Sequence, residues 1–221
     1  MINNVAIVCN GLFPKKEYPR HLIRTADFII CCDGALNSFL RNSKAIFGEV
    51  RNPDIVIGDL DSLPANVAAN YQGKIIKVSE QETNDQSKAV RYVLENLADV
   101  SSIHILGATG KREDHTIGNL SLLMEYAREY DLESRGIYID AVSDYSSAFA
   151  ITDSTEIGLG KGRRISIFCP DNSLRICSEG LEWRTDDVVF DNWWKATLNR
   201  TTEDTVKLKF SHKSIALILT D

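Results

Sequence analysis

The chain has 221 residues, of which 43% are hydrophobic and 25% are charged, with a formal net charge of −6 and a pI near 5.3. This length accommodates one large domain or two small ones, and either can bury a sufficient core. The acidic balance argues against non-specific binding to nucleic acid or to an anionic membrane. An anionic substrate such as a nucleotide would need to arrive with a metal cation.

Targeting signals and a structural role for cysteine are not expected. The N-terminal segment lacks the basic region and long apolar core of a signal peptide, and no run reaches the roughly 18 apolar residues of a membrane helix. Four of the five cysteines lie inside apolar runs, and no C-x-x-C pair is present. This pattern favours buried free thiols over disulfides or zinc ligands. We therefore predict a cytoplasmic protein that binds neither membrane nor nucleic acid.

Short apolar runs rich in Ile and Val alternate with helical patterns through the first half of the chain. The runs, with the polar residues that follow them, span 5–11, 28–36, 54–62, 74–85 and 103–115. Such runs are typical of strands buried on both faces of a parallel sheet. The helical period is clearest over 85–98 and 115–130, and shorter helices are expected after Asp33 and after Ser62, the latter with Pro64 in its first turn. Alternating strands and helices predict βαβ units.

The chain changes character near residue 150. One more strand of the first layer is expected at 137–142, and the helical period then disappears. Short β runs separated by Gly, Pro, Asn and Asp follow at 163–170, 174–183, 205–212 and 214–221. This arrangement is typical of a small antiparallel sandwich. The sequence thus predicts an α/β domain over 1–148 and a β-sandwich over 149–221.

Acidic residues follow the predicted strands. In open α/β sheets, ligands bind beyond the carboxyl ends of the strands. Five aspartates are therefore expected to converge on one rim: Asp33, Asp59, Asp61, Asp85 and Asp114. Carboxylates gathered in this way repel one another unless a cation lies among them. Asp59 and Asp61 are residues i and i+2 of an extended segment, so their side chains face the same way and can bind one ion. Because Mg²⁺ prefers carboxylates, phosphates and water, the rim predicts magnesium holding substrate phosphates.

Structural interpretations remain open for these residues. The aspartates of 59–61 are also suited to capping the next helix, and either Asn84 or Asp85 is a plausible N-cap. Lys88, one turn into that helix, is placed either to reach a phosphate or to remain a solvated surface lysine. The glycine-rich segment 107–115 is not a Walker A loop, because Ile105 stands where that pattern requires glycine. It still opens a helix, whose N-terminal N–H groups favour anions.

The motifs together resemble one family. They are CDGAL (32–36), DIVIGDLDS (54–62), QETNDxxKA (81–89), GATGKREDHxxxN (107–119) and SEGLEW (178–183). In this order and spacing they resemble the thiamine pyrophosphokinases (thiamine diphosphokinases). The resemblance implies an N-terminal parallel-sheet α/β (Rossmann-like) domain, which binds ATP and Mg²⁺, followed by a C-terminal antiparallel β-sandwich that binds thiamine. It also implies a homodimer with active sites between the subunits, and transfer of the diphosphate of ATP to the hydroxyl of thiamine, giving thiamine diphosphate and AMP.

The resemblance implies a role for each matching residue. Catalysis falls to Asp59, Asp61, Asp85 and Lys88, and magnesium to Asp33, Asp59, Asp61 and Asp85. Nucleotide binding falls to Asp33, Gly34, Gln81, Asn84, Arg112, Asp114 and Asn119. Thiamine binding falls to Ser178, Trp183, Thr197 and Asn199. A cation–π contact between the Trp183 indole and the cationic thiamine rings would contribute roughly 1–2 kcal/mol.

Three positions depart from the family pattern: Asn84 replaces a common Thr, Lys111 a common Gly, and Leu198 a common Ser. The general base is expected to be Asp61 or Asp85. Two other classes of function stay open, a Mg²⁺-dependent nucleotide phosphohydrolase and a non-catalytic nucleotide-binding sensor. We also expect one of two adjacent tryptophans, Trp193 and Trp194, to face a partner or ligand, since both cannot point inward from an extended strand.

Overall fold

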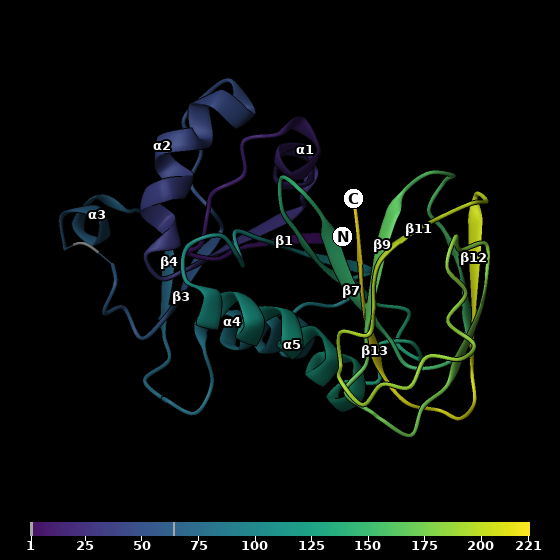
Figure 1. Cartoon of the computed structure of the whole chain (residues 1–221). Coiled ribbons are helices and arrows are strands. Elements are labelled where there is room, and N and C mark those ends of the chain that lie inside the picture. Colours follow the sequence, from purple (N-terminus) through teal and green to yellow (C-terminus); the bar gives the residue numbers. More distant parts are fainter. Residues whose placement is uncertain (1, 64) are drawn as a thin grey trace. The chain divides into compact units, whose positions relative to one another are not determined.

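The computed structural model describes residues 2–63 and 65–221 (Figure 1). Contacts within the chain divide it into two compact units. The first unit comprises the chain up to Leu122 together with Glu133–Asp144, and the second comprises Leu123–Leu132 and Tyr145–Asp221. In the described part of the chain, no helix is both long enough and apolar enough to cross a bilayer.

The first unit contains a parallel sheet, as the sequence predicts. In spatial order its strands are β4 (Lys74–Lys77), β3 (Ile55–Gly58), β2 (Phe28–Cys32), β1 (Asn4–Val8), β5 (Ser102–Leu106) and β6 (Tyr138–Val142). Each neighbouring pair is parallel. The strand order reverses direction at β1, which lies between β2 and β5. Open α/β sheets bind ligands at such a topological switch point.

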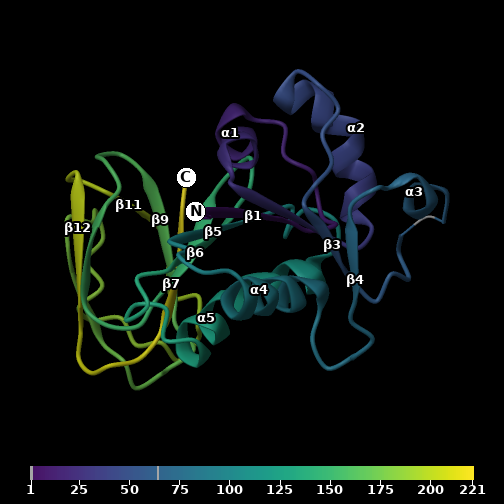
Figure 2. The same ribbon diagram turned by 180° about the vertical axis from the view of Figure 1, so that it is seen from behind.

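Helices cover both faces of this sheet, and Figures 1 and 2 show the two groups from opposite sides. On one face, α1 (Glu17–Thr25) and α2 (Ala35–Phe47) pack Ile23 and Phe39 against alternate strand residues such as Ala6 and Val8. On the other face, α4 (Asp85–Asn96) contacts β1, β2 and β3. The central strands β1, β2 and β3 are almost entirely buried because helices cover both of their faces, whereas the edge strand β4 is mostly exposed.

Two further helices complete the set of helices in the described residues. The short α3 (Ala65–Asn70) follows β3, and the expected place of Pro64 in its first turn lies outside the described residues. Helix α5 (Glu113–Glu129) follows β5. The helices predicted over 85–98 and 115–130 are confirmed with shifts of about two residues, whereas α1 was not predicted, because it is short and polar and contains Pro19.

The second unit is a sandwich of two antiparallel sheets, which confirms the predicted class. One sheet has the order β11 (Ala196–Arg200), β9 (Arg164–Phe168), β13 (Ala216–Thr220), β7 (Ser147–Ile151), and the other has β10 (Ile176–Glu179), β12 (Thr205–Phe210), β8 (Thr155–Gly158). Residues from both sheets, including Ile167, Ile176 and Leu208, form a single core. Strand β12 alternates strictly between exposed and buried residues, as a strand with one solvated face does.

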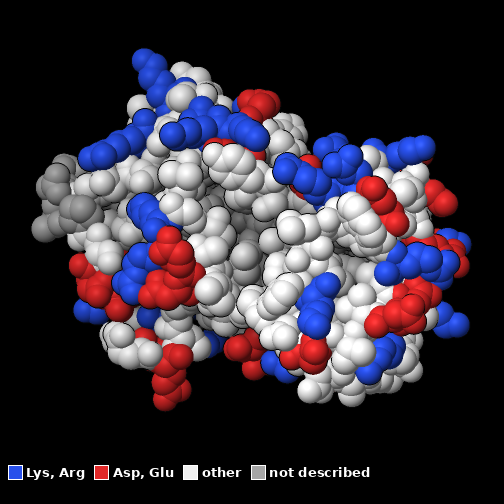
Figure 3. All heavy atoms as spheres, in the orientation of Figure 1, with Lys and Arg blue, Asp and Glu red and all other residues white. Residues whose placement is uncertain are grey.

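The loop at 159–163 connects one sheet of the sandwich to the other. It joins β8, which pairs with β12, to β9, which pairs with β11 and β13, so it passes between the two sheets. The backbone N–H groups of Leu159 and Gly160 bond the carbonyl of Asp204, which stabilises this crossing. On the face shown in Figure 3, acidic and basic side chains are interspersed. Ion pairs of the second unit include Lys207 with Glu156 and Arg184 with Asp186.

Candidate functional site

A cleft of about 310 Å³ opens at the carboxyl ends of the strands of the first unit. Its walls come from the segments after β1 and β5, from the start of α2 and from the start of α4. Asn10, Asp33, Asp85, Arg112 and Asn119 are among the lining residues. The cleft therefore lies at the switch point of the sheet, the place where this class of fold binds ligands.

Close approach of two loops shapes one side of the cleft. Gly11, after β1, donates its N–H to the carbonyl of Gly107, after β5, at 2.7 Å. A Cβ atom added to Gly11 would lie only 2.2 Å from that carbonyl oxygen, so no larger residue fits without a backbone shift. Gly107 itself has a φ of 64°, which favours glycine. These two glycines let the loops that flank the switch point touch.

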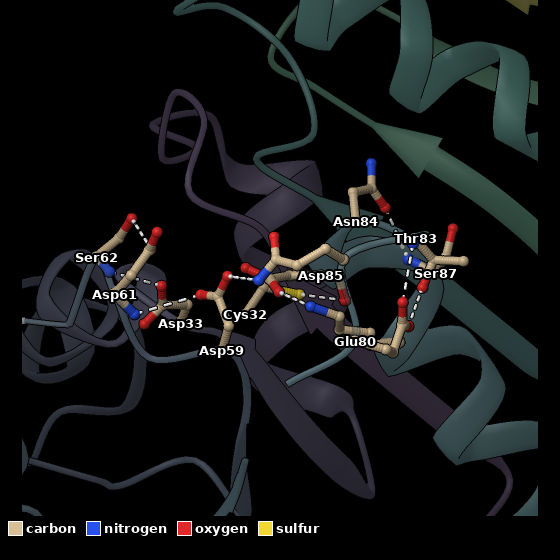
Figure 4. A network of polar contacts seen from close by, with 12 residues as sticks. Cys32, Asp33, Asp59, Asp61, Ser62, Glu80, Thr83, Asn84, Asp85 and Ser87 are labelled. Atoms are coloured by element: carbon tan, nitrogen blue, oxygen red, sulfur yellow. Dashed lines mark hydrogen bonds and ion pairs between the residues drawn. The ribbon is translucent and has the colours of Figure 1, made fainter. Parts of the chain in front are cut away.

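Three aspartates meet at one edge of the cleft region (Figure 4). Carboxylate oxygens of Asp33, Asp59 and Asp61 all lie within 4.8 Å of one another, which is compatible with a single cation among them. Gly58, the last residue of β3, provides the space, because an added Cβ would lie 2.9 Å from Asp33 Cβ and 3.1 Å from Asp85 Oδ1. The parallel strand ends thus gather the carboxylates as the sequence predicts.

Asp33 is the most constrained member of the cluster. It is buried directly after β2 with a φ of 41°, and its N–H bonds the Ile57 carbonyl at 2.9 Å. Its Oδ2 accepts the Ser62 N–H at 2.9 Å, whereas Oδ1 is buried without a hydrogen-bond partner among the described residues. Burial raises the pKa of Asp33, and the neighbouring carboxylates add to this shift. A buried carboxylate oxygen without a partner fits the chemistry of a hard cation such as Mg²⁺.

Asp85 occupies the first position of α4 beside this cluster. Burial raises its pKa, and Lys88 opposes the shift with its Nζ atom 3.3 Å from Asp85 Oδ1. The Lys88 side chain is almost completely buried, which excludes the interpretation of a solvated surface lysine. Because isolated buried ammonium groups are unfavourable, Lys88 needs an anion, and Asp85 supplies one within the chain.

The sequence left either Asn84 or Asp85 as the N-cap of α4, and the structure shows that Asn84 is the cap. Its Oδ1 accepts the Ser87 N–H at 3.0 Å, and its Nδ2 donates to Asn119 Oδ1 at 2.8 Å. Asn119 in turn donates to the carbonyl of Ala108 at 2.7 Å. These bonds link the start of α4 to the segment after β5. Since Asn84 performs the capping, the carboxylate of Asp85 remains available to the cleft region.

The exposed residues of the predicted site form two groups. Gln81 lies beside the aspartate cluster, and Arg112 and Asp114 lie in the segment after β5. Gln81 donates to Asp59 Oδ2 at 3.1 Å, and this hydrogen bond is the main cause that lowers the pKa of Asp59. Arg112, by contrast, bonds Asp114 with its Nε 3.1 Å from Asp114 Oδ1. The guanidinium of Arg112 therefore pairs with Asp114 within one loop, and the convergence of Asp114 on the carboxylate rim stays a prediction. Arg112 lines the cleft, and Asp114 orients it.

Several residues of the cleft, among them Ser62 and Asn10, were not predicted as site residues. Ser62 provides the N–H that holds Asp33, and Asn10 lines the cleft and accepts a hydrogen bond from Lys111 Nζ at 3.2 Å. Asn10 lies two residues beyond the end of the first strand, so the rule that identified the aspartates also applies to it. Gly34 begins α2 beside Asn10, and an added Cβ would lie 2.7 Å from Asn10 Nδ2.

The residues predicted to bind thiamine lie in the second unit, and their polar atoms are largely engaged there. Asn199 accepts the Trp183 N–H at 3.1 Å and donates to the Trp183 carbonyl at 2.6 Å. Ser178 is fully buried and accepts the Thr185 N–H at 2.9 Å. These bonds fix the backbone of a segment whose indole is 58% exposed. Thr197 lies on the edge strand β11, next to the exposed Leu198.

Trp193 and Trp194 lie in a turn before β11, and not on an extended strand as expected. Consequently both indoles are partly exposed, at 43% and 53%. Trp193 packs on Phe168 with ring centroids 5.0 Å apart. The alternation argument does not apply to a turn, where successive side chains need not face opposite ways.

The fold and the site define a class of protein: a parallel α/β unit with a carboxylate-lined cleft at its switch point, joined to an antiparallel β-sandwich. The family model "Thiamin pyrophosphokinase, catalytic domain" matches residues 19–133, and "Thiamin pyrophosphokinase, substrate-binding domain" matches residues 148–216. The chain belongs to the thiamin pyrophosphokinase family.

Individual relatives agree with this assignment. Thiamin pyrophosphokinase 1 of Caenorhabditis elegans is 29% identical over 202 residues, which cover 88% of this chain and 80% of the relative. Thiamine pyrophosphokinase 3 of Oryza sativa subsp. japonica is 32% identical over 133 residues, but that match spans only 53% of this chain and about half (49%) of the rice protein. The solved structure of thiamin pyrophosphokinase from Candida albicans has the same fold, with a TM-score of 0.76 at 18% identity, over 99% of this chain and 88% of that chain.

We expect Asp33→Asn to stabilise the metal-free protein at neutral pH. Because the folded state raises the pKa of Asp33, its ionised form opposes folding above that pKa, and the penalty disappears as the pH falls through it. Asparagine removes the charge, retains an oxygen for the Ser62 N–H and tolerates positive φ. Thermal unfolding without divalent metal should show a higher melting temperature for the variant at neutral pH, and a smaller difference in acid.

Asp59→Asn is the matched control within the same cluster. Hydrogen bonding lowers the pKa of Asp59, so its ionised form favours folding and neutralising it should not stabilise the protein. An Asp33→Asn protein that melts below the wild type at neutral pH would contradict the assignment of Asp33 as the strained carboxylate.

Proposed function

We propose that this protein is a thiamine diphosphokinase, which transfers the diphosphate of ATP to the hydroxyl of thiamine and releases AMP. The observation that carries the proposal is the carboxylate cluster at the switch point of a chain that matches both the catalytic and the substrate-binding models of its family. We assign ATP and Mg²⁺ to residues 1–148 and thiamine to residues 149–221. We also propose that the enzyme is cytoplasmic and acts without nucleic acid or membrane, in keeping with its formal net charge of −6.

The magnesium site is proposed at Asp33, Asp59 and Asp61, with Asp85 beside them. The three clustered carboxylates and the unpartnered Oδ1 of Asp33 fit this ion. Bound magnesium would neutralise the charge that develops on the transferred phosphates. Gln81 orients Asp59 through its hydrogen bond, and Ser62 orients Asp33.

Cationic side chains of the chain would hold the remaining phosphate charge. Diphosphate transfer requires in-line positioning and charge neutralisation more than covalent participation by the protein. Lys88 Nζ already contacts Asp85 and would move its hydrogen bonds toward an incoming phosphate oxygen. Arg112, kept in position by Asp114, faces the same cleft. The Asn84–Asn119 pair, with Gly34 at the start of α2, keeps the nucleotide-binding loops in place.

The acceptor hydroxyl needs a base, and two aspartates were candidates. Asp61 is exposed and accepts a hydrogen bond from Ser62 Oγ at 2.9 Å. Asp85 is partly buried with a raised pKa, and a raised pKa makes a carboxylate a stronger base. We therefore assign to Asp85 the transient acceptance of the hydroxyl proton, with Lys88 keeping its carboxylate ionised beforehand.

The thiamine site is proposed around Trp183. Its exposed indole offers a face for the cationic rings of the vitamin. Asn199 and Ser178 would act by fixing the segment that presents the indole, and Thr197 would contribute a hydroxyl from the edge strand. We further propose a homodimer in which this surface of one subunit completes the cleft of the other.

The first test concerns the bond that is broken. Attack at the β-phosphorus of ATP should produce AMP one-for-one with thiamine diphosphate, and only with a divalent metal present. Product analysis by ion-exchange chromatography, with and without thiamine and with and without chelator, checks this. A phosphohydrolase would release phosphate without thiamine, and a nucleotide sensor would bind ATP without turnover. Either result would replace the proposed activity.

The second prediction concerns the cluster itself. Asp61→Asn preserves shape but removes a negative charge from the proposed metal site, and should lower the turnover number at least ~10–100-fold. Asp153→Asn is the matched control, because Asp153 is exposed in the second unit and accepts the Ser154 N–H. Circular dichroism should show that both variants are folded. Full activity in a folded Asp61→Asn enzyme would reduce Asp61 to a structural role.

The third prediction tests the shared site. Asp61→Asn subunits and Trp183→Ala subunits should each be inactive, because each lacks one half of the site. In a mixture that has exchanged subunits, one site of each heterodimer regains both intact halves, so activity should reappear. Differently tagged subunits allow the heterodimer to be purified and assayed. A monomeric enzyme, or an inactive purified heterodimer, would exclude sharing.

A further inference from the structure

Two cysteine side chains meet in the cleft: Cys32 is the first residue of the CDGAL motif, and Cys9 lies outside the motifs. Cys9 follows β1 and Cys32 ends β2, and both line the cleft. Their Sγ atoms lie 3.9 Å apart, and both residues are buried. Both are free thiols.

The parallel sheet creates this pair. Strands β1 and β2 are in register up to Val8 and Cys31, and Cys9 and Cys32 each stand one residue further along. Successive strand residues point to opposite faces, so Cys31 enters the core under α1 and α2 while Cys32 does not. Neither sulfur is needed to fill that core.

The separation of the sulfurs suits a bridging metal better than a disulfide. A tetrahedral zinc ion with Zn–S bonds of about 2.3 Å places two thiolates about 3.8 Å apart. A disulfide requires about 2.05 Å between the sulfurs, so the separation of 3.9 Å is that of two ligands of one metal and not that of an S–S bond.

Two oxygen atoms that could also bind a metal lie beside the thiols. Gln86 Oε1 lies 3.9 Å from Cys9 Sγ, and the amide is oriented by donating its Nε2–H to the Asn119 carbonyl at 3.0 Å. The carbonyl of Asp85 lies 3.5 Å from Cys32 Sγ. Two soft sulfurs and an amide oxygen differ in chemistry from the all-carboxylate cluster nearby, so the two groups select different cations.

We propose that Cys9, Cys32 and Gln86 form a second cation site, which binds a thiophilic divalent ion such as Zn²⁺. Binding breaks both S–H bonds, releases two protons to solvent and forms two metal–thiolate bonds, with no change in oxidation state. The ion is held at the inner side of the cleft, one residue away from Asp33 and from Asp85. This proposal stands on the thiol geometry and does not require the diphosphokinase activity.

Cd²⁺ is a suitable probe, because Cd–thiolate bonds give an ultraviolet charge-transfer band that carboxylates do not. The full-length protein, kept reduced with a phosphine in excess Mg²⁺, should develop this band and saturate with one equivalent of Cd²⁺. Zn²⁺ should then remove the band by competition. Cys9→Ser and Cys32→Ser should each weaken Cd²⁺ binding at least ~10–100-fold, since loss of even an outer-sphere partner has that effect.

Cys177→Ser is the matched control, because Cys177 is exposed on β10 of the second unit and should not contribute. Cys9→Ala and Cys32→Ala serve as second variants if a buried serine impairs folding, with circular dichroism as the check. An unchanged band in folded Cys9 and Cys32 variants, a band lost in Cys177→Ser, or no saturable band in the wild type would each overturn the site. Binding needs no substrate, so these outcomes are independent of whether the protein makes thiamine diphosphate.

Discussion

Mutual repulsion between carboxylates at the ends of β2 and β3 is the constraint on which the site depends. Asp33, Asp59 and Asp61 have oxygens within 4.8 Å of one another, and Asp33 is buried. Backbone hydrogen bonds and the space beside Gly58 hold them there, although burial and neighbouring charge oppose the ionised form of Asp33. Such an arrangement is stable in a folded protein only because the surrounding sheet over-determines it, and it prepares the site for a cation.

Different neighbouring side chains stabilise the individual carboxylates. Lys88 sits almost fully buried against Asp85, and Gln81 bonds Asp59 from the preceding loop. Asn84 is the N-cap of α4, so the side chain of Asp85 is not needed for capping. The departure from the family's common threonine at position 84 is therefore compatible with the site, because asparagine provides both the capping oxygen and a donor to Asn119.

In the described residues of the second unit, buried polar side chains fix the backbone and are not gathered into a charged cluster. Asn199, Ser178 and Thr185 are buried, and their hydrogen bonds fix a short segment of backbone that leaves Trp183 exposed. A large aromatic residue on a rigid base is well suited to bind a flat cationic ligand, since little conformational entropy is lost on binding. Leu198, with a φ of 59° and high exposure, lies beside this base and stands where the family commonly has serine.

The sequence by itself determined the parallel α/β class, the β-sandwich, the order of the motifs and most members of the carboxylate cluster. It succeeded there because strand periodicity and strand-end position are local properties that survive into the fold. Only the tertiary structure decided that Asn84 and not Asp85 caps α4, and that Asp114 pairs with Arg112. It alone brought Cys9 to Cys32, since contact between neighbouring strands depends on register and sheet order, and neither can be read from spacing along the chain.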